Sequence, residues 1–415
     1  MRSRTLLLAL AALALAAPAD AQRFPIDARA VPPRPALFAG ADTLDADVYY
    51  MHGVSRLDPE PAEAAAAFYW AARLRPGWAD ALYGRRVALL MAQRDSRFID
   101  YMTGQRNVAR AADIQAIDSL YLRALELDPF LFRKLDRVLL NNFWRRNAAE
   151  FFHGRGLAPN TAEIGAWIRE AMNDPENDMR GWMAYSEGRF PDAIDWYQRR
   201  VQRGGRYRAQ ARTDFARVLF MAGDHRRAAE EMARAVAEMR RQDEKDLIFV
   251  YDSKALVEHS LALIHDQLGQ ADSAREAYGR ALQENLAYHP AHVRLARRAL
   301  AAGDTAAALS ELALAAEIAP RDAAVHFEHA QALAGAQKYE EAMEALEKAA
   351  EAEPYYAAPH LLLGRIYDAH GMRTETIASL RAYLARAARD EPRVDWARQR
   401  ADELEAALKA EAGGR

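Results

Sequence analysis

The chain has 415 residues and contains no cysteine. A chain without cysteine forms no disulfide and offers neither a thiol nucleophile nor a thiolate metal site. It also lacks the residue that a bacterial lipoprotein would acylate. Because the formal net charge is only −3, electrostatics give no reason to expect nucleic acid as a partner.

Recognisable catalytic and cofactor-binding motifs are missing as well. The sequence has no G-x-S-x-G, no phosphate-binding loop and no G-x-G-x-x-G. His326 and His329 are spaced unlike either common zinc motif and have no evident third ligand. We therefore expect no catalytic residue, no cofactor, no metal and no enzymatic activity. A remote alternative places unrecognised chemistry in the irregular third helix pair described below.

A long apolar run occurs only at the N-terminus. Arg2 and Arg4 precede twelve apolar residues at 6–17, and the small-x-small sequence at 19–21 is typical of a signal-peptide cleavage site. Such a run is too short to span a bilayer as a helix. We expect a signal peptide at 1–21 and a soluble, exported protein in the periplasm or outside the cell, with no stable membrane insertion after cleavage. The prolines within 22–42 predict an extended, poorly ordered linker.

The strongest positive pattern is a repeat with an offset of 34 residues. Pro320 and Pro354 end two stretches in which alanine, leucine and alanine recur at the same spacing. Small residues allow two helices to approach closely, the leucine fills the space beside them, and the proline ends the helix. The positions are Ala308, Leu312 and Ala315 in one unit and Ala342, Leu346 and Ala349 in the next.

This period and these residues resemble the tetratricopeptide-repeat (TPR) family. The resemblance implies an all-α fold, a right-handed superhelical α-solenoid of stacked antiparallel helix pairs, because a two-helix unit this short needs neighbours to bury its apolar faces. About nine such pairs would occupy residues 43–410. The pattern is irregular at 94–177, has insertions near 94–113 and 239–251, and ends with a polar capping helix at 394–410 and a disordered tail at 411–415.

By resemblance, certain positions of the first helix in each pair face a concave groove. Aromatic and arginine side chains, which favour peptide binding, occupy many of these positions. The alternative is that the aromatic residues complete the core between helices. The groove candidates are Tyr83, Phe143, Trp182, Tyr185, Arg217, His259, Arg297, Phe327, Gln331 and Arg365.

The family resemblance favours a scaffold or adaptor that binds a protein or peptide partner in this groove. The alternative is a structural component of a cell-envelope assembly that acts through its ends or outer face. The lysine and asparagine arrangement with which some family members hold a terminal carboxylate is not reproduced, so that function is not expected. Neither the partner nor the oligomeric state follows from the sequence.

One column of histidines follows the same period. His292, His326 and His360 are 34 residues apart, at equivalent positions of consecutive units. Equivalent positions on stacked helices lie about 10 Å apart, whereas zinc–nitrogen bonds are about 2 Å. We therefore expect these rings to be buried spacers between helices rather than ligands of one metal.

Overall fold

A computed structural model describes residues 30–92, 111–139, 141, 179–205, 207–244 and 253–413. The predicted signal peptide and most of the irregular stretch lie outside these ranges. Within them the chain forms helices and loops, with no β-strand, as the repeat pattern predicted. None of the helices in these ranges is long and apolar enough to cross a membrane.

The first part of the structure, residues 30–92 and 111–139, is called the N-terminal block. Asp45 caps its first helix by accepting from the backbone of Asp47 at 2.7 Å, and Pro61 opens the second. Phe68 is fully buried among the first three helices. A Cβ on Gly84 would lie 2.7 Å from the Phe68 ring, so this close contact requires glycine. The helices are α2 (Ala46–Arg56), α3 (Pro61–Leu74), α4 (Ala79–Met91) and α6 (Ala111–Leu127).

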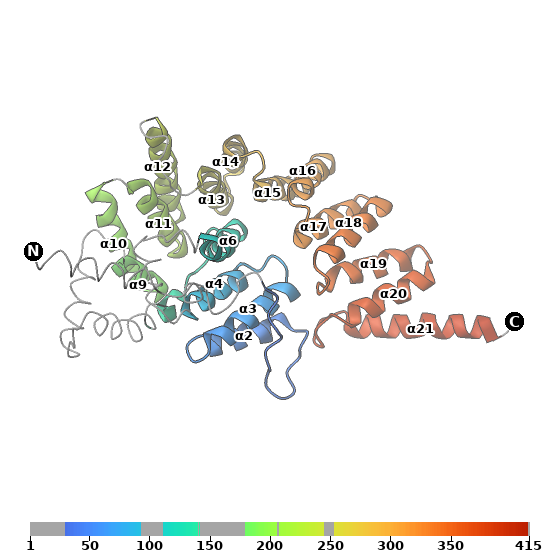
Figure 1. Ribbon diagram of the computed structural model, residues 1–415. Coiled ribbons are helices and arrows are strands. Elements are labelled where there is room, and N and C mark those ends of the chain that lie inside the picture. The colour runs from blue at the N-terminus through green and yellow to red at the C-terminus, as the bar shows by residue number, and fades with distance from the viewer. Residues whose placement is uncertain are drawn as a thin grey trace, which may run out of the picture.

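The remaining helices form a second part, residues 179–413 where described, which is called the array. Most of its helices pack chiefly against the preceding and following helix, and together they follow an arc (Figure 1). The helices are α9 (Met179–Ser186), α10 (Phe190–Arg203), α11 (Arg208–Met221), α12 (His225–Asp243), α13 (Lys254–Gln267), α14 (Ala271–Glu284), α15 (His289–Ala301), α16 (Thr305–Ile318), α17 (Ala323–Gly335), α18 (Tyr339–Ala352), α19 (Ala358–Ala369), α20 (Arg373–Leu384) and α21 (Val394–Gly413).

The alanine and leucine positions that recur every 34 residues form the core of the array. Each of the six alanine and leucine positions quoted from the sequence has 0% exposure, which confirms the predicted helix contacts. The turn within each pair also repeats. Gly269, Gly303 and Gly371 have positive φ values, and Gln337 occupies the equivalent position with φ 63°. Glycine reaches this left-handed region without strain, whereas glutamine does not.

The histidine column matches the sequence prediction at two of its three positions. His292 and His326 are buried, while His360 is half-buried. The first two rings also contact polar groups: Nδ1 of His292 lies 2.6 Å from the carboxylate of Glu311, and Nε2 of His326 lies 3.0 Å from the carbonyl of Pro320. The contact with Glu311 orients His292 towards the following helix, α16. The contact with Pro320 orients His326 towards the loop that precedes its own helix.

The C-terminal helix covers the last pair of the array. Val394, Ala397 and Ala401 of α21 are buried against α20, while its other side is mostly charged. The disordered tail expected at 411–415 is corrected in part, because α21 continues through 411–413. Glu411 is held there by a hydrogen bond from Arg373 at 2.5 Å.

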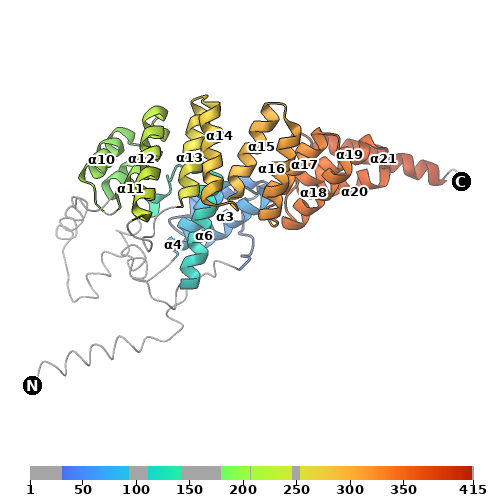
Figure 2. The ribbon, with the colours of Figure 1, turned by 90° about the horizontal axis from the view of Figure 1, so that it is seen from above.

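The N-terminal block lies inside the arc of the array. Helices α11, α13, α15, α17 and α19 line the inner side of the arc, and α3, α4 and α6 lie next to them (Figure 1). The view turned by 90° also places the block beside α13 to α17 (Figure 2). The inner face of the array, on which the sequence predicted a peptide groove, is therefore partly covered by the chain itself.

Candidate functional site

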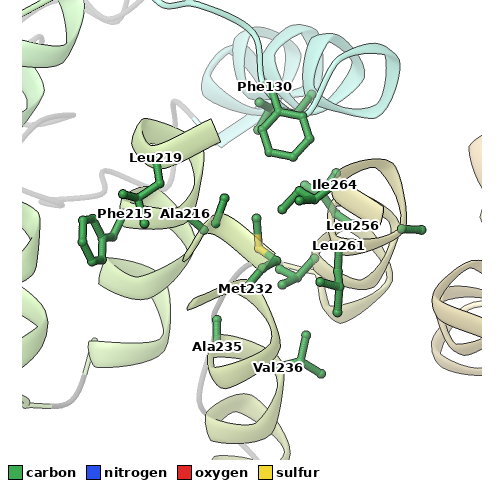
Figure 3. Close-up of a cluster of buried hydrophobic side chains, with 14 of the residues drawn as sticks. Phe130, Phe215, Ala216, Leu219, Met232, Ala235, Val236, Leu256, Leu261 and Ile264 are labelled. Carbon is green, nitrogen blue, oxygen red and sulfur yellow. The ribbon is translucent and has the colours of Figure 1, made fainter. Parts of the chain in front are cut away.

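The central part of the inner face is filled by the segment that follows α6. Phe130 stacks on Phe220 of α11, with ring centroids 3.8 Å apart and planes inclined by 21°. Figure 3 shows Phe130 next to the apolar cluster formed by Met232, Leu256 and Ile264. An apolar side chain of the N-terminal block thus occupies the region where a partner's side chain was expected.

Two of the predicted groove residues meet at a buried carboxylate. The hydroxyl of Tyr83 donates to Asp136 at 2.7 Å, and Nε1 of Trp182 donates to the other carboxylate oxygen at 2.5 Å. Tyr83 and Asp136 are 1% and 2% exposed. Burial, reinforced by the neighbouring carboxylate, raises the pKa of Tyr83 well above its usual value. The cluster joins α4 to α9 and is structural; Asp136, its centre, carries no motif that would reveal this role in the sequence.

Tyr185 and Arg217 lie in the same interior region. Tyr185 is 2% exposed and packs edge-to-face on Phe132 with centroids 5.6 Å apart. Arg217 is 8% exposed and donates to Asp214 at 3.1 Å. Neither side chain is presented to a partner. Phe143 and most of the irregular stretch, to which the enzyme hypothesis assigned chemistry, lie outside the described residues.

His259 is enclosed between aromatic rings. Its ring is 5.4 Å from those of both Tyr278 and Tyr288, and the residue is 1% exposed. Nδ1 makes no hydrogen bond within the described part of the chain. Burial, with a smaller contribution from the positive charge of Arg294, lowers the pKa of His259 to about 3. The ring is therefore a neutral core group and not a groove contact.

Helix α6 is attached to the array by ionic contacts. Arg123 forms an ion pair with Asp322 and donates to Nε2 of His289 at 2.8 Å. Asp322 is also the capping residue of α17, where it accepts from the backbone of Ala324 at 3.0 Å. Burial and the adjacent guanidinium lower the pKa of His289 to about 4. A single residue of the block therefore contacts the beginning of α15 and the N-cap of α17.

The other four predicted groove residues lie on α15, α17 and α19, where Phe327 is half-buried and the other three are exposed. Arg297 is paired through two hydrogen bonds with Glu328, at 2.6 and 2.7 Å. Phe327 packs edge-to-face on Tyr356 with centroids 5.3 Å apart. Gln331 is exposed. This surface, made by α15, α17 and α19, is called the open groove segment.

Arg365 differs from the other three residues. It is exposed on α19, in the position equivalent to those of Gln331 one unit earlier and Arg297 two units earlier. Within the described ranges it takes part in no hydrogen bond or ion pair. Its guanidinium therefore retains its full set of donors for a ligand.

These stacked helix pairs, with buried small residues at a constant offset, define an α-solenoid of helical repeats. The sequence model of the tetratricopeptide repeat family matches residues 259–288 and 323–356. The chain therefore contains tetratricopeptide repeats at these residues, and such repeats support a protein-interaction scaffold. No curated protein matches the chain significantly in sequence.

Solved structures with similar helix arrangements include the crystal structure of MamA protein. It is 18% identical, and the alignment covers 42% of this chain and 88% of that chain with a TM-score of 0.35. The crystal structure of the APC/C hetero-tetramer Cut9–Hcn1 is 14% identical. That alignment covers 86% of this chain and 76% of the other, with a TM-score of 0.38.

Proposed function

We propose that the chain is an exported, non-catalytic scaffold that binds a protein or peptide partner along the open groove segment. The observation that carries this proposal is the unpaired, exposed guanidinium of Arg365, aligned with Gln331 and Arg297 on successive inner helices. The N-terminal block contacts the first residues of α15, the N-cap of α17 and the α18–α19 loop, whereas Gln331 and Arg365, further along α17 and α19, are exposed.

The chemistry of the segment indicates what the partner presents. An arginine guanidinium such as that of Arg365 forms strong, paired hydrogen bonds with carboxylates, and the half-buried rings of Phe327 and Tyr356 offer an aromatic surface to an apolar side chain. Arg297 is already neutralised by Glu328. A peptide with one acidic group beside an apolar residue satisfies both features.

A photo-crosslinking amino acid at position 331 tests where the partner binds. The matched control carries it at Glu344, an exposed position on the outer helix α18. In the cell that produces the protein, we expect one specific adduct from position 331. Adding Arg365→Ala should abolish that adduct, while Arg275→Ala, an exposed arginine on α14, should not change it.

Two other outcomes contradict the groove proposal. Adducts from position 344 alone would instead support the envelope-assembly alternative, in which the outer face makes the contacts. An adduct from position 331 that survives Arg365→Ala would exclude the guanidinium as a binding group. Export is tested separately: mass spectrometry of the purified protein should find an N-terminal peptide that begins at Gln22, and one that begins at Met1 would contradict it.

A further inference from the structure

A proline-rich segment at residues 31–38 crosses the boundary between the two parts of the molecule. It has no helix or strand. Its backbone is fixed by Trp70 of α3, whose Nε1 donates to the carbonyl of Pro32 at 3.2 Å. The proline content predicted a poorly ordered linker, and these contacts were not foreseeable from composition.

Arg34 in this segment contacts two aromatic rings from opposite ends of the chain. Its guanidinium carbon lies 4.5 Å from the ring centroid of Trp70 and 5.4 Å from that of Tyr355, in the loop between α18 and α19. The two rings are nearly perpendicular, at 81°, with centroids 5.0 Å apart. A flat cation therefore lies within interaction distance of both rings.

Neighbouring contacts hold the two rings in place. Arg73 of α3 forms an ion pair with Glu353, and its guanidinium carbon lies 5.2 Å from the centroid of Tyr355. Trp70 is 5% exposed and packs edge-to-face on Tyr69. The site is thus built from fixed side chains of α3 and the α18–α19 loop, and not from the segment that occupies it.

The segment itself has the spacing of an extended proline-rich ligand. Pro32 and Pro35, three residues apart, are half-buried, while Pro33 between them is exposed. A polyproline II chain has three residues per turn, so the same side faces its support every third residue. Aromatic grooves bind such chains through their prolines and through hydrogen bonds to their carbonyl groups.

We propose that Trp70 and Tyr355 form a peptide-binding site for an extended, proline-flanked arginine, and that residues 32–35 of the chain itself occupy it. This intramolecular ligand joins the N-terminal block to the last units of the array. The proposal concerns a different surface from the open groove segment and does not depend on it.

A labelled synthetic peptide of residues 30–40 tests the proposal by fluorescence anisotropy. Arg34→Glu in the full chain weakens the intramolecular ligand, because a carboxylate is repelled by the faces of the two rings. We expect the peptide to bind this variant at least about tenfold more tightly than the wild-type chain, whose site is already occupied. A chain carrying Arg275→Ala controls for the loss of an arginine and should behave as wild type.

Three further measurements locate the interaction. A peptide with Arg34→Glu should not bind the Arg34→Glu chain. Trp70→Phe, which removes the indole N–H, and Tyr355→Leu, which removes the second ring, should each weaken binding of the wild-type peptide to that chain. Equal binding to the wild-type and Arg34→Glu chains, or tight binding of the Arg34→Glu peptide, would overturn the proposal. So would unchanged affinity in both ring variants, provided circular dichroism shows them folded.

Discussion

The backbone N–H of Arg389 donates a hydrogen bond to the carboxylate of Asp42 at 2.6 Å, although the two residues are 347 positions apart. Asp42 precedes the first helix of the block, and Arg389 follows α20 near the end of the array. In an ordinary solenoid each unit contacts only its neighbours. Here the first and last units also contact each other, so unfolding one end removes a contact from the other end.

The Arg73–Glu353 pair should contribute measurably to this closure. Their side chains are 27% and 11% exposed, and burial raises the pKa of Glu353 despite the adjacent guanidinium. Arg73→Ala leaves a mostly buried carboxylate without its partner and should lower the free energy of unfolding by about 1–3 kcal/mol. Arg75→Ala is the matched control, because its pair with Asp47 is far more exposed. Urea titration compares them, and equal losses would contradict the prediction.

The repeat core gives a second prediction. Leu346 is fully buried in the cluster shared by α17, α18 and α19. Leu346→Ala should lower the free energy of unfolding by about 2–5 kcal/mol, because it removes buried methyl groups and leaves a cavity. Glu347→Ala, one residue further on an exposed face, should change stability by less than about 0.5 kcal/mol. Chemical denaturation measures the loss of stability in both variants. Equal losses would show that Leu346 is not part of a packed core.

The turn at Gln337 predicts an increase in stability. Gln337 has φ 63°, where the equivalent residues of neighbouring units are glycines. Gln337→Gly should stabilise the protein by about 1 kcal/mol, since the left-handed conformation strains side chains with a Cβ. The same change at Gln331, an exposed residue within α17, should instead destabilise by about 1 kcal/mol. Thermal melting distinguishes the two, and a lower melting temperature for Gln337→Gly would refute the assignment of strain.

Acid sensitivity is predicted from His259. Its folded-state pKa of about 3 is below the unfolded value of about 6.5. The folded state therefore binds fewer protons than the unfolded state in this window, so its contribution to stability is full above pH 6.5 and falls as the pH decreases towards 3.

Between pH 7 and pH 5, protonation of His259 in the unfolded state should lower the free energy of unfolding by about 2 kcal/mol. His259→Phe should remove that part of the loss. Burial also lowers the pKa of His360, to about 4, but His360 is present in both proteins, so its contribution cancels in the comparison. Urea titrations at the two pH values provide the test. If the wild type and the variant lose equal stability on acidification, His259 is not the neutral buried group described here.

Local repetition made much of the array predictable. The alanine and leucine columns recur at a fixed offset because each unit packs on the next in the same way, and all six positions quoted from the sequence are buried. The family's position rule also placed Arg297, Gln331 and Arg365 on accessible surface.

The closure of the chain was not predictable from these patterns. A repeat specifies contacts between neighbours but not how far the whole array curves. Arg123 contacts Asp322 only because that curvature brings α6 to the beginning of α17. For the same reason His259 and Tyr83, which the position rule assigned to a groove, became interior residues.

Contacts such as the one between Asp42 and Arg389 also impose an order on folding. Helix pairs form from residues that are close in sequence and therefore assemble fast. A contact between residues at the two ends of the chain forms only after the intervening units have folded. Because synthesis proceeds from the N-terminus, Trp70 and Phe130 are made long before the units that cover them. The nascent N-terminal block therefore exposes Phe130 until α11 is made and Trp70 until the α18–α19 loop is made, and this interval is when it is most vulnerable to aggregation.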